Sequence, residues 1–446
     1  MIANYWKYHK FPVLIALGCI VLYASFAYQL VRTDFIKLIT LYGALFFLYT
    51  KVIALEKGNM GFLSALALVF RVVFILSIPN LSQDFYRFIW DGQLSLNGLN
   101  PYLHLPDDLV TDPALPIANA RELHEGMGNL SARHYTNYPP VNQLCFLIAS
   151  ALGGNGVLGP VIAMRLLIVL ADAGTWYFGR KLLTALKLPE HYIFYYLLNP
   201  LIIIEFTGNL HFEGMMLFFL IWSLYLLHSG KWAASAVIMA LSVSVKLIPL
   251  MLVPLVLQKL GWKKAILYGI AVCAVVLVLF LPFISGELVD HYMQTTRLWF
   301  VNFEFNGSIY YLIREIGFRV KGYNIIHSVG KVTPFIITGF ILLLAFFRRN
   351  RETIPLITGM LLALSFYFFL STTIHPWYIG TLVVLSVFTR YRFPLVWSAV
   401  IMLSYSAYGA DGFGENPWLL GIEYLTVYGF FLWEVFLKSM KYEVRS

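Results

Sequence analysis

Charged residues are scarce in this chain, and their scarcity decides its class. Only 12% of the 446 residues are Asp, Glu, Lys or Arg, whereas 59% are hydrophobic. A single soluble core cannot bury that much apolar surface, which excludes an ordinary water-soluble globular domain. Apolar runs of about 17 to 25 residues, long enough to cross a bilayer, recur from end to end. We therefore predict an all-α, polytopic transmembrane protein with about 12–14 membrane segments.

Cysteine is also rare, with only Cys19, Cys145 and Cys273 present. All three fall inside apolar runs, and they are too few and too scattered for a disulfide framework or a zinc site. We expect them to be small core residues.

The chain shows no repeated motif, and its formal net charge of +9 does not indicate a nucleic-acid partner. The basic residues cluster in short segments between apolar runs, which is the pattern that orients membrane proteins. We therefore expect membrane lipid, and no nucleic acid, around this protein.

The same pattern predicts a topology for residues 1–446, which we interpret as one integral membrane domain. Lys7 and Lys10 precede the first apolar run and place the amino terminus in the cytoplasm. Long extracytoplasmic loops are then expected at residues 80–140 and 284–330.

Several predicted membrane spans determine which segments lie on each side of the membrane. The first three are predicted near Phe11–Leu30, Phe35–Ala54 and Gly61–Pro79, and a later one at Tyr192–Phe206. Val141–Gly153 is too short to cross a hydrocarbon core of about 30 Å and is predicted to be re-entrant. Trp232–Leu257 is predicted to be a bent pair that breaks around Lys246 and Pro249.

The polar residues that are unexpected in such a chain map to the extracytoplasmic side of this topology. They are Asp84, Arg87, Asp91, Tyr138, Asn142, Asn209, His211, Glu213, Arg297, Asn306 and His375. Lys246 lies on the same side if its two helical segments form a shallow hairpin. A charged side chain near the bilayer centre costs about 3 kcal/mol, so several at one level indicate a functional cavity. We predict one outward-facing site.

Six motifs occur in order between Ser82 and Tyr378. They are DFYRFIWDGQLSLNGLNPY, NYPPVNQL, NPLIIIEFTGNLHFEG, SVKLIPLMLVP, FNGSIYYLIR and HPWY. Together they resemble the GT-C superfamily of integral membrane glycosyltransferases, in particular its bacterial polyprenyl-phosphate-mannose-dependent branch.

The resemblance implies a GT-C-like fold and a multi-pass protein of the bacterial inner membrane whose active site faces outward. It implies transfer of a hexose, mannose in this branch, from a polyprenyl-phosphate donor to a lipid- or glycan-linked acceptor, with inversion at the anomeric carbon. Single displacement needs a carboxylate that takes the proton of the acceptor hydroxyl. By family position Asp84 is that general base.

Asp91 lies seven residues after Asp84, on the same face if the segment is helical. It is a second catalytic candidate or orients the acceptor. The alternative for both Asp84 and Asp91 is that the acid only caps a juxtamembrane helix or pairs with Arg87. The leaving lipid phosphate needs cations, and we assign donor phosphate binding to Lys246, with Arg297 and His375 as secondary candidates.

The remaining polar residues are predicted to bind substrate. They are Arg87, Tyr138, Asn142, Asn209, His211, Glu213 and Asn306. No cofactor or metal is expected, because Lys and Arg can hold a lipid phosphate; a divalent cation at His211 and Glu213 is the alternative left open.

Two other functions compete with this interpretation. A transporter or a lipid or glycan flippase also has many spans and intramembrane charge, but it typically shows internal repeats and a midplane site. Other GT-C chemistries, such as transfer of aminoarabinose, glucose or an oligosaccharide, would differ only in donor and acceptor.

Overall fold

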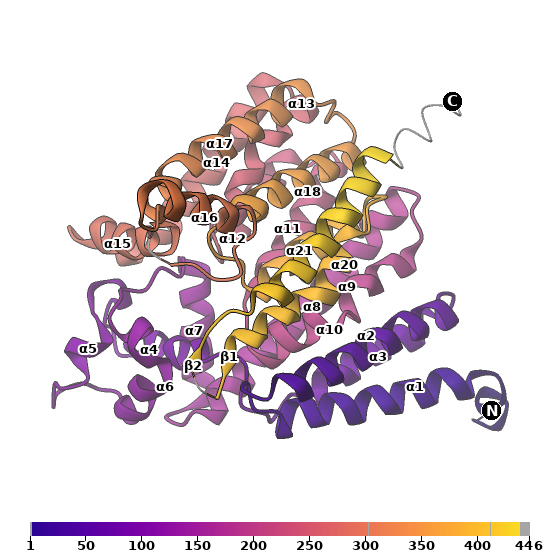
Figure 1. Ribbon diagram of the computed structural model, residues 1–446, viewed down its shortest axis with the longest axis horizontal. Coiled ribbons are helices and arrows are strands. Elements are labelled where there is room, and N and C mark those ends of the chain that lie inside the picture. The colour runs from indigo at the N-terminus through magenta and orange to yellow at the C-terminus, as the bar shows by residue number, and fades with distance from the viewer. Residues whose placement is uncertain (1, 302, 411, 438–446) are drawn as a thin grey trace. The chain divides into compact units, whose positions relative to one another are not determined.

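The computed structural model of the protein describes residues 2–301, 303–410 and 412–437 (Figure 1). Within these ranges the regular structure is almost entirely helical. The one sheet among the described residues pairs β1 (Tyr408–Gly409) with β2 (Gly412–Phe413) in antiparallel fashion. The predicted all-α fold class is therefore confirmed.

The chain divides into two compact units, each assembled from separate segments. Unit 1 comprises Met1–Leu81, Leu183–His211 and Pro376–Ser446, and unit 2 comprises Ser82–Leu182 and Phe212–His375. The chain thus leaves and re-enters unit 1, and neither unit is one continuous stretch of sequence.

Seven helices in the described part of the chain are long and apolar enough to cross a membrane. They are α1 (Ile2–Gln29), α2 (Phe35–Glu56), α8 (Leu158–Ala185), α14 (Trp262–Phe280), α17 (Ile326–Phe347), α18 (Thr353–Leu370) and α21 (Pro417–Leu432). Six shorter apolar helical segments accompany them. Large apolar side chains on these helices face outward, for example Ile270 and Leu277 of α14, as expected where lipid is the solvent.

In unit 1, the helices α1, α2 and α3 (Met60–Val72) pack against one another (Figure 1). Asn59 caps α3 by accepting a hydrogen bond from the Phe62 amide, and the helix ends at Val72 rather than continuing to Pro79 as predicted. Arg71, in its last turn, is buried and donates hydrogen bonds of 2.8 Å to the carbonyls of Ala67 and Leu197. These two bonds tie the last turn of α3 to the segment that carries Leu197.

The prediction of a single span at Tyr192–Phe206 is wrong. The structure has four short pieces instead: η2 (Glu190–Ile193), α9 (Phe194–Leu197), α10 (Pro200–Ile202) and the π-helix η3 (Ile203–Gly208). Asn199 begins α10, because its side chain accepts from the Leu201 amide and Pro200 occupies the first helical position. The Asn199 amide also donates to Ser398 at 2.9 Å, which fixes the break.

In unit 2, α4 (Asp84–Leu96) packs against α6 (Ala120–Ala132) and α7 (Pro140–Gly153) (Figure 1). The approach of α4 to α7 depends on Gly92, where a Cβ atom would lie 2.3 Å from the Phe146 carbonyl oxygen. The short helices η1 (Pro101–Leu103) and α5 (Pro106–Leu109) lie between α4 and α6 in the chain. The 14-residue length of α7 agrees with the short segment predicted there.

The break predicted around Lys246 and Pro249 within Trp232–Leu257 is present. α11 (Glu213–His228) is followed by α12 (Trp232–Val243), which ends before a break, and the chain resumes as the 3-10 helix η4 (Ile248–Val256). Lys246 lies in the break and Pro249 at the start of η4. Hydrogen bonds among Ser223, Ser235 and Tyr268 join α11, α12 and α14.

The remaining helices complete the two units. In unit 2 they are α13 (Leu257–Leu260), η5 (Leu281–Phe283), α15 (Leu288–Val301) and α16 (Ile309–Lys321). In unit 1 they are η6 (Pro376–Tyr378), α19 (Ile379–Ser386), α20 (Phe393–Val400), η7 (Ile401–Ala407) and η8 (Trp433–Leu437).

Candidate active site

Asp84, the predicted base, is the first residue of α4 and is half-buried. Its backbone amide donates to the Ser82 hydroxyl at 3.3 Å, which holds the start of the helix. A helix amino terminus is a favourable place for a negative charge, because the backbone dipoles point their positive ends there. The local structure therefore suits a carboxylate at this position.

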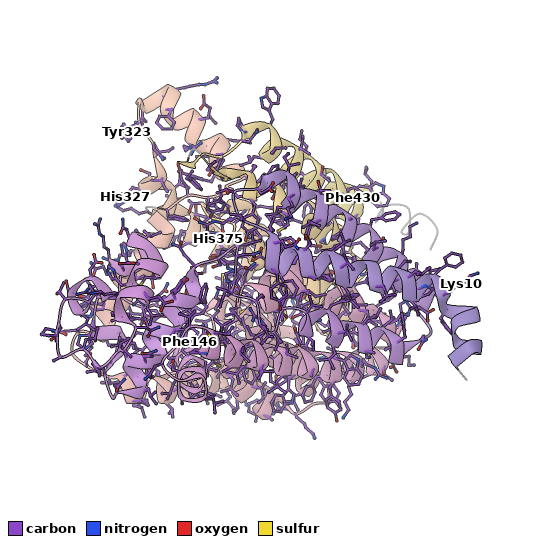
Figure 2. The ribbon with its side chains drawn as sticks, turned by 90° about the horizontal axis from the view of Figure 1, so that it is seen from below. Lys10, Phe146, Tyr323, His327, His375 and Phe430 are labelled. Atoms are coloured by element: carbon purple, nitrogen blue, oxygen red, sulfur yellow. The ribbon has the colours of Figure 1, made fainter. Side chains whose placement is uncertain are left out.

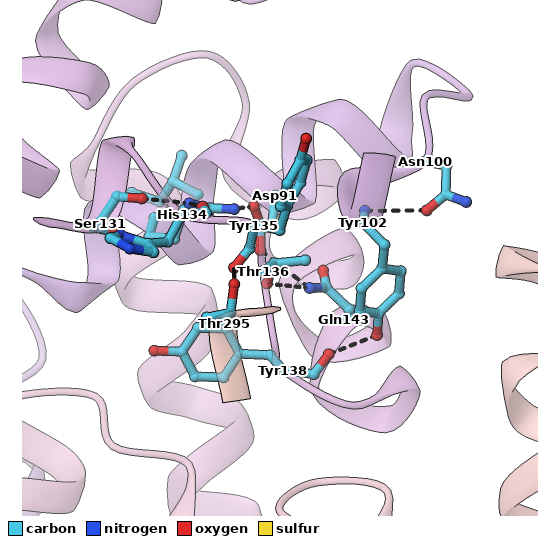
Figure 3. Close-up of polar contacts among 12 residues, drawn as sticks. Asp91, Asn100, Tyr102, Ser131, His134, Tyr135, Thr136, Tyr138, Gln143 and Thr295 are labelled. Atoms are coloured by element: carbon cyan, nitrogen blue, oxygen red, sulfur yellow. Dashed lines mark hydrogen bonds and ion pairs between the residues drawn. The ribbon is translucent and has the colours of Figure 1, made fainter. Parts of the chain in front are cut away.

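Asp91 lies deeper on the same helix and is fully buried. The Arg87 Nε atom donates to Asp91 Oδ1 at 2.7 Å, and Gln143 Nε2 of α7 donates to Asp91 Oδ2 at 3.0 Å (Figure 3). Arg87 also donates to the carbonyls of Ser131 and His134, at 2.7 and 2.9 Å. The pairing with Arg87 that the sequence left as an alternative is thus present, and it ties α4 to the end of α6.

An aromatic cluster fills the space beside these residues. Phe88 and Phe146 stack with ring centroids 4.5 Å apart, and Tyr138 and Phe212 each pack edge-on against both rings. The Tyr138 carbonyl accepts a hydrogen bond of 2.6 Å from Tyr102 (Figure 3). Phe88 lies one helical turn after Asp84, so the cluster extends from the face of α4 that carries Asp84 to Phe212.

Glu213 follows Phe212 directly, begins α11 and is fully buried. One of its carboxylate oxygens, Oε1, forms an ion pair with the ammonium of Lys246. The Lys246 side chain is 20% exposed, whereas the Glu213 side chain is fully buried. The cationic residue predicted to hold phosphate thus has a carboxylate neighbour.

His375 and Asn306 come from two segments that pair with each other. The Phe305 amide donates to the Thr372 carbonyl at 3.1 Å, and the Ile374 amide donates to the Phe305 carbonyl at 2.8 Å. The His375 ring then stacks on Phe305 with centroids 5.0 Å apart. Asn306 is buried and has a left-handed backbone, with φ of 51°.

Burial and the nearby Lys246 ammonium lower the pKa of His375 to about 3. At neutral pH its imidazole is therefore uncharged, and it can contact a phosphate only as a neutral hydrogen-bond donor. Figure 2 labels His375 and Phe146, which both belong to unit 2.

The lowered pKa of His375 predicts a specific acid sensitivity. Unfolded His375 takes up a proton below about pH 6.5 and the folded residue only near pH 3, so the unfolded state gains stability as the pH falls between these values. Between pH 7.5 and 5.5 the protonation of unfolded His375 should lower the free energy of unfolding by about 1.4 kcal/mol. In His375→Gln the melting temperature should fall less over this interval than in the wild type.

Thermal unfolding in detergent at the two pH values checks this expectation, with His134→Gln, a partly exposed histidine of the same unit, as the matched control. An equal loss in wild type and His375→Gln would contradict the assignment.

Asn142 and Ser244 meet where α7 begins and α12 ends. The backbone amides of Val141 and Asn142 donate to the Ser244 carbonyl, at 2.9 and 3.4 Å. Both side chains are fully buried. Ser244 precedes Lys246 by two residues, so this junction lies next to the Lys246–Glu213 pair.

In unit 1, a second polar cluster surrounds Glu205 of η3, which is fully buried. Tyr405 donates to Glu205 Oε1 at 2.8 Å, Asn209 donates to Oε2 at 3.3 Å, and His211 Nε2 lies 3.5 Å from the same oxygen. The His211 ring stacks on Trp377 with centroids 3.7 Å apart. Two of the predicted substrate-binding residues, Asn209 and His211, are thus held around an acid that the sequence analysis did not single out.

Arg297, the other predicted phosphate ligand, has an exposed side chain on α15. His211 and Glu213, for which a cation was left open, contact different partners, Glu205 and Lys246. Among the described residues no group of three or more His, Cys, Asp or Glu side chains is arranged to hold a metal ion.

Sequence reasoning missed Glu205, Gln143 and Ser244. An acidic residue inside an apolar run was the available signal for Glu205. Gln143 and Ser244 gave no signal, because neutral polar residues are common at helix ends.

Residues 12–261, more than half of the chain, match the family described as alpha-(1->6)-mannopyranosyltransferase, N-terminal domain. The chain belongs to this family. The match confirms the predicted resemblance to membrane GT-C mannosyltransferases. It includes Asp84, Asp91, Asn142, Glu213 and Lys246, and it ends before Arg297, Asn306 and His375.

Curated relatives agree with the family. The chain is 24% identical over 176 residues to alpha-(1->6)-mannopyranosyltransferase B of Corynebacterium glutamicum, covering 38% of this chain and 28% of the relative. It is 23% identical over 185 residues to alpha-(1->6)-mannopyranosyltransferase A of Mycobacterium tuberculosis, covering 41% and 34%. The matched region thus spans about a third of each relative's own length. No solved structure matches the chain.

Proposed function

We propose that the protein is a membrane glycosyltransferase that moves mannose from a polyprenyl-phosphate donor to a hydroxyl group of a lipid- or glycan-linked acceptor. The observation that carries the proposal is the family match, which covers the amino-terminal half of the candidate site. The relatives are alpha-(1->6)-mannopyranosyltransferases by name, which supports mannose as the sugar. The polyprenyl-phosphate donor is supported by the resemblance of the motifs and by the lipid-facing character of the helices.

The proposed reaction is a single displacement. The Asp84 carboxylate takes the proton of the acceptor hydroxyl while its oxygen forms a bond to the anomeric carbon of the sugar. The bond from that carbon to the phosphate oxygen breaks, and polyprenyl phosphate leaves with the electron pair. Attack opposite to the leaving group inverts the anomeric carbon.

The departing phosphate gains one negative charge, and Lys246 is the proposed group that stabilises it. Its ammonium already contacts Glu213, so the phosphate shares this cation with the carboxylate. His375 adds a neutral donor on the same side of unit 2, and Arg297 has an exposed guanidinium that suits a lipid headgroup. The chain needs no resident metal ion in this scheme.

The setting proposed for this reaction is the bacterial inner membrane, with the site on its outer face. The support is the distribution of Lys and Arg among the connecting segments and the place of Asp84 after three predicted spans.

The test is a panel assay on the full chain in lipid nanodiscs. Polyprenyl-phosphate mannose, polyprenyl-phosphate glucose and the nucleotide sugar GDP-mannose are each offered with mannoside acceptors, and products are identified by mass spectrometry. We expect a mannosylated acceptor and free polyprenyl phosphate with the first donor, and no product with the nucleotide sugar. Movement of the intact donor across liposomes without bond cleavage would support a flippase instead.

A further inference from the structure

Three buried polar groups around Lys246 lack protein partners in the described structure. Neither side-chain atom of Asn142 makes a hydrogen bond to any described residue, and the same holds for Ser244 Oγ and Glu213 Oε2. All three residues are fully buried. Buried polar atoms are nearly always bonded, because an unsatisfied one forfeits its bonds to water without replacement. Asn142 lies in α7, Glu213 begins α11 and Ser244 follows α12 directly. Three unsatisfied residues that come from separate segments therefore indicate a bound polar group.

The three groups are neighbours by their backbone and ion-pair contacts. Asn142 and Ser244 are joined by the amide-to-carbonyl bonds at the start of α7. Ser244 lies two residues before Lys246, which holds the other oxygen of Glu213. Phe212, directly before Glu213, packs against Phe146 of α7 with centroids 5.4 Å apart, which places the start of α11 against α7.

The chemistry of these groups selects a neutral polyol over an anion. An amide offers a donor and an acceptor, a serine hydroxyl offers both, and a carboxylate oxygen only accepts. Adjacent sugar hydroxyls each donate and accept, and so match this set. A phosphate among these three groups would lie against Glu213 Oε2, the oxygen without a hydrogen-bond partner among the described residues, and would be repelled there.

From this arrangement we infer that Asn142, Ser244 and the free oxygen of Glu213 bind the hydroxyl groups of the transferred sugar and determine which hexose is accepted. The inference rests on the proposed function for the identity of the sugar donor. This inference separates two roles: the Lys246 ammonium binds the phosphate, and Asn142, Ser244 and Glu213 Oε2 bind the sugar ring. Asn142 and Ser244 are thus specificity-determining residues.

A stability measurement distinguishes this role from a structural one. Leucine is close to asparagine in size, and Asn142→Leu removes two unsatisfied atoms, so the substrate-free variant should melt at or above the wild-type temperature. Asn199 is the matched control, because its side-chain amide is also buried but is hydrogen-bonded to the Ser398 hydroxyl and to the Leu201 backbone amide. Asn199→Leu should melt several degrees below the wild type. If Asn142→Leu loses as much as Asn199→Leu, its amide is structural and the inference fails.

A binding measurement tests the sugar directly and does not require turnover. The melting temperature of the wild type in detergent is compared with polyprenyl phosphate and with polyprenyl-phosphate mannose; we expect an extra increase with the sugar. Asn142→Leu and Ser244→Ala should lose this increment and keep the shift caused by polyprenyl phosphate. A full sugar-dependent increment in both variants would overturn the inference.

Turnover then tests selectivity. In Asn142→Leu, KM for polyprenyl-phosphate mannose should rise about tenfold, and the preference over polyprenyl-phosphate glucose should shrink by a similar factor. An unchanged preference would count against the inference. If the wild type transfers neither sugar, the proposed function fails, while the sugar-dependent melting shift still decides whether the cluster binds a sugar.

Discussion

Asp84→Asn should lower kcat for mannosyl transfer by about 10²- to 10⁴-fold, because the amide keeps the size of the side chain but accepts no proton from the acceptor. The substitution retains the start of α4, where asparagine is also favourable beside a helix terminus, so the melting temperature should change little. KM for the donor should stay within a few-fold of the wild type, since the lost step is proton removal and not donor binding.

The matched control is Asp108→Asn, which removes an exposed acid in the segment between α4 and α6 of the same unit. It should transfer mannose at the wild-type rate. The measurement is initial rate against donor concentration in nanodiscs. Wild-type turnover by Asp84→Asn would remove this residue as the base and leave Asp91 as the remaining catalytic candidate.

Arg87→Met should be the most destabilising of the substitutions considered, with a loss of about 3–5 kcal/mol, because it leaves the fully buried Asp91 carboxylate without its counter-charge. The double variant Arg87→Met/Asp91→Leu should recover much of this loss, since an apolar pair of similar volume can replace a buried ion pair. It will not recover all of it, because Gln143 and the Ser131 and His134 carbonyls lose their partners.

The same double variant separates the two roles considered for Asp91. Both carboxylate oxygens of Asp91 accept hydrogen bonds, from Arg87 and Gln143, and so are not available to take a proton from the acceptor. We therefore expect the rate of mannosyl transfer by the folded double variant to stay within about tenfold of the wild-type rate. Unfolding in detergent and initial rates are the two measurements. A folded double variant as inactive as Asp84→Asn would show that Asp91 takes part in the reaction.

Local sequence signals predicted some of the fold well. The short helix at Pro140–Gly153 and the break at Lys246 follow from run length, from Pro249 and from a charge inside an apolar run. The single span at Tyr192–Phe206 was predicted from apolar character alone. Hydropathy does not distinguish one straight helix from several short pieces that are all buried, and the capping by Asn199 decided the outcome.

The candidate site was predictable as a set of residues but not as a set of contacts. Asn209, His211 and Glu213 lie within five positions of sequence, yet the first two contact Glu205 and the third contacts Lys246. Leu210, between them, has a left-handed backbone with φ of 62°, which turns the chain. Partners such as Tyr405 for Glu205 come from distant segments, so no spacing in the sequence could reveal them.

The bond from Tyr405 to Glu205 also constrains how the protein is made. During synthesis the ribosome delivers the π-helix to the membrane some 200 residues before the phenol that binds its carboxylate. Until that late segment is inserted, the acid lacks one of its hydrogen-bond donors. Unit 1 is therefore completed only after the segment that begins at Pro376 has been made.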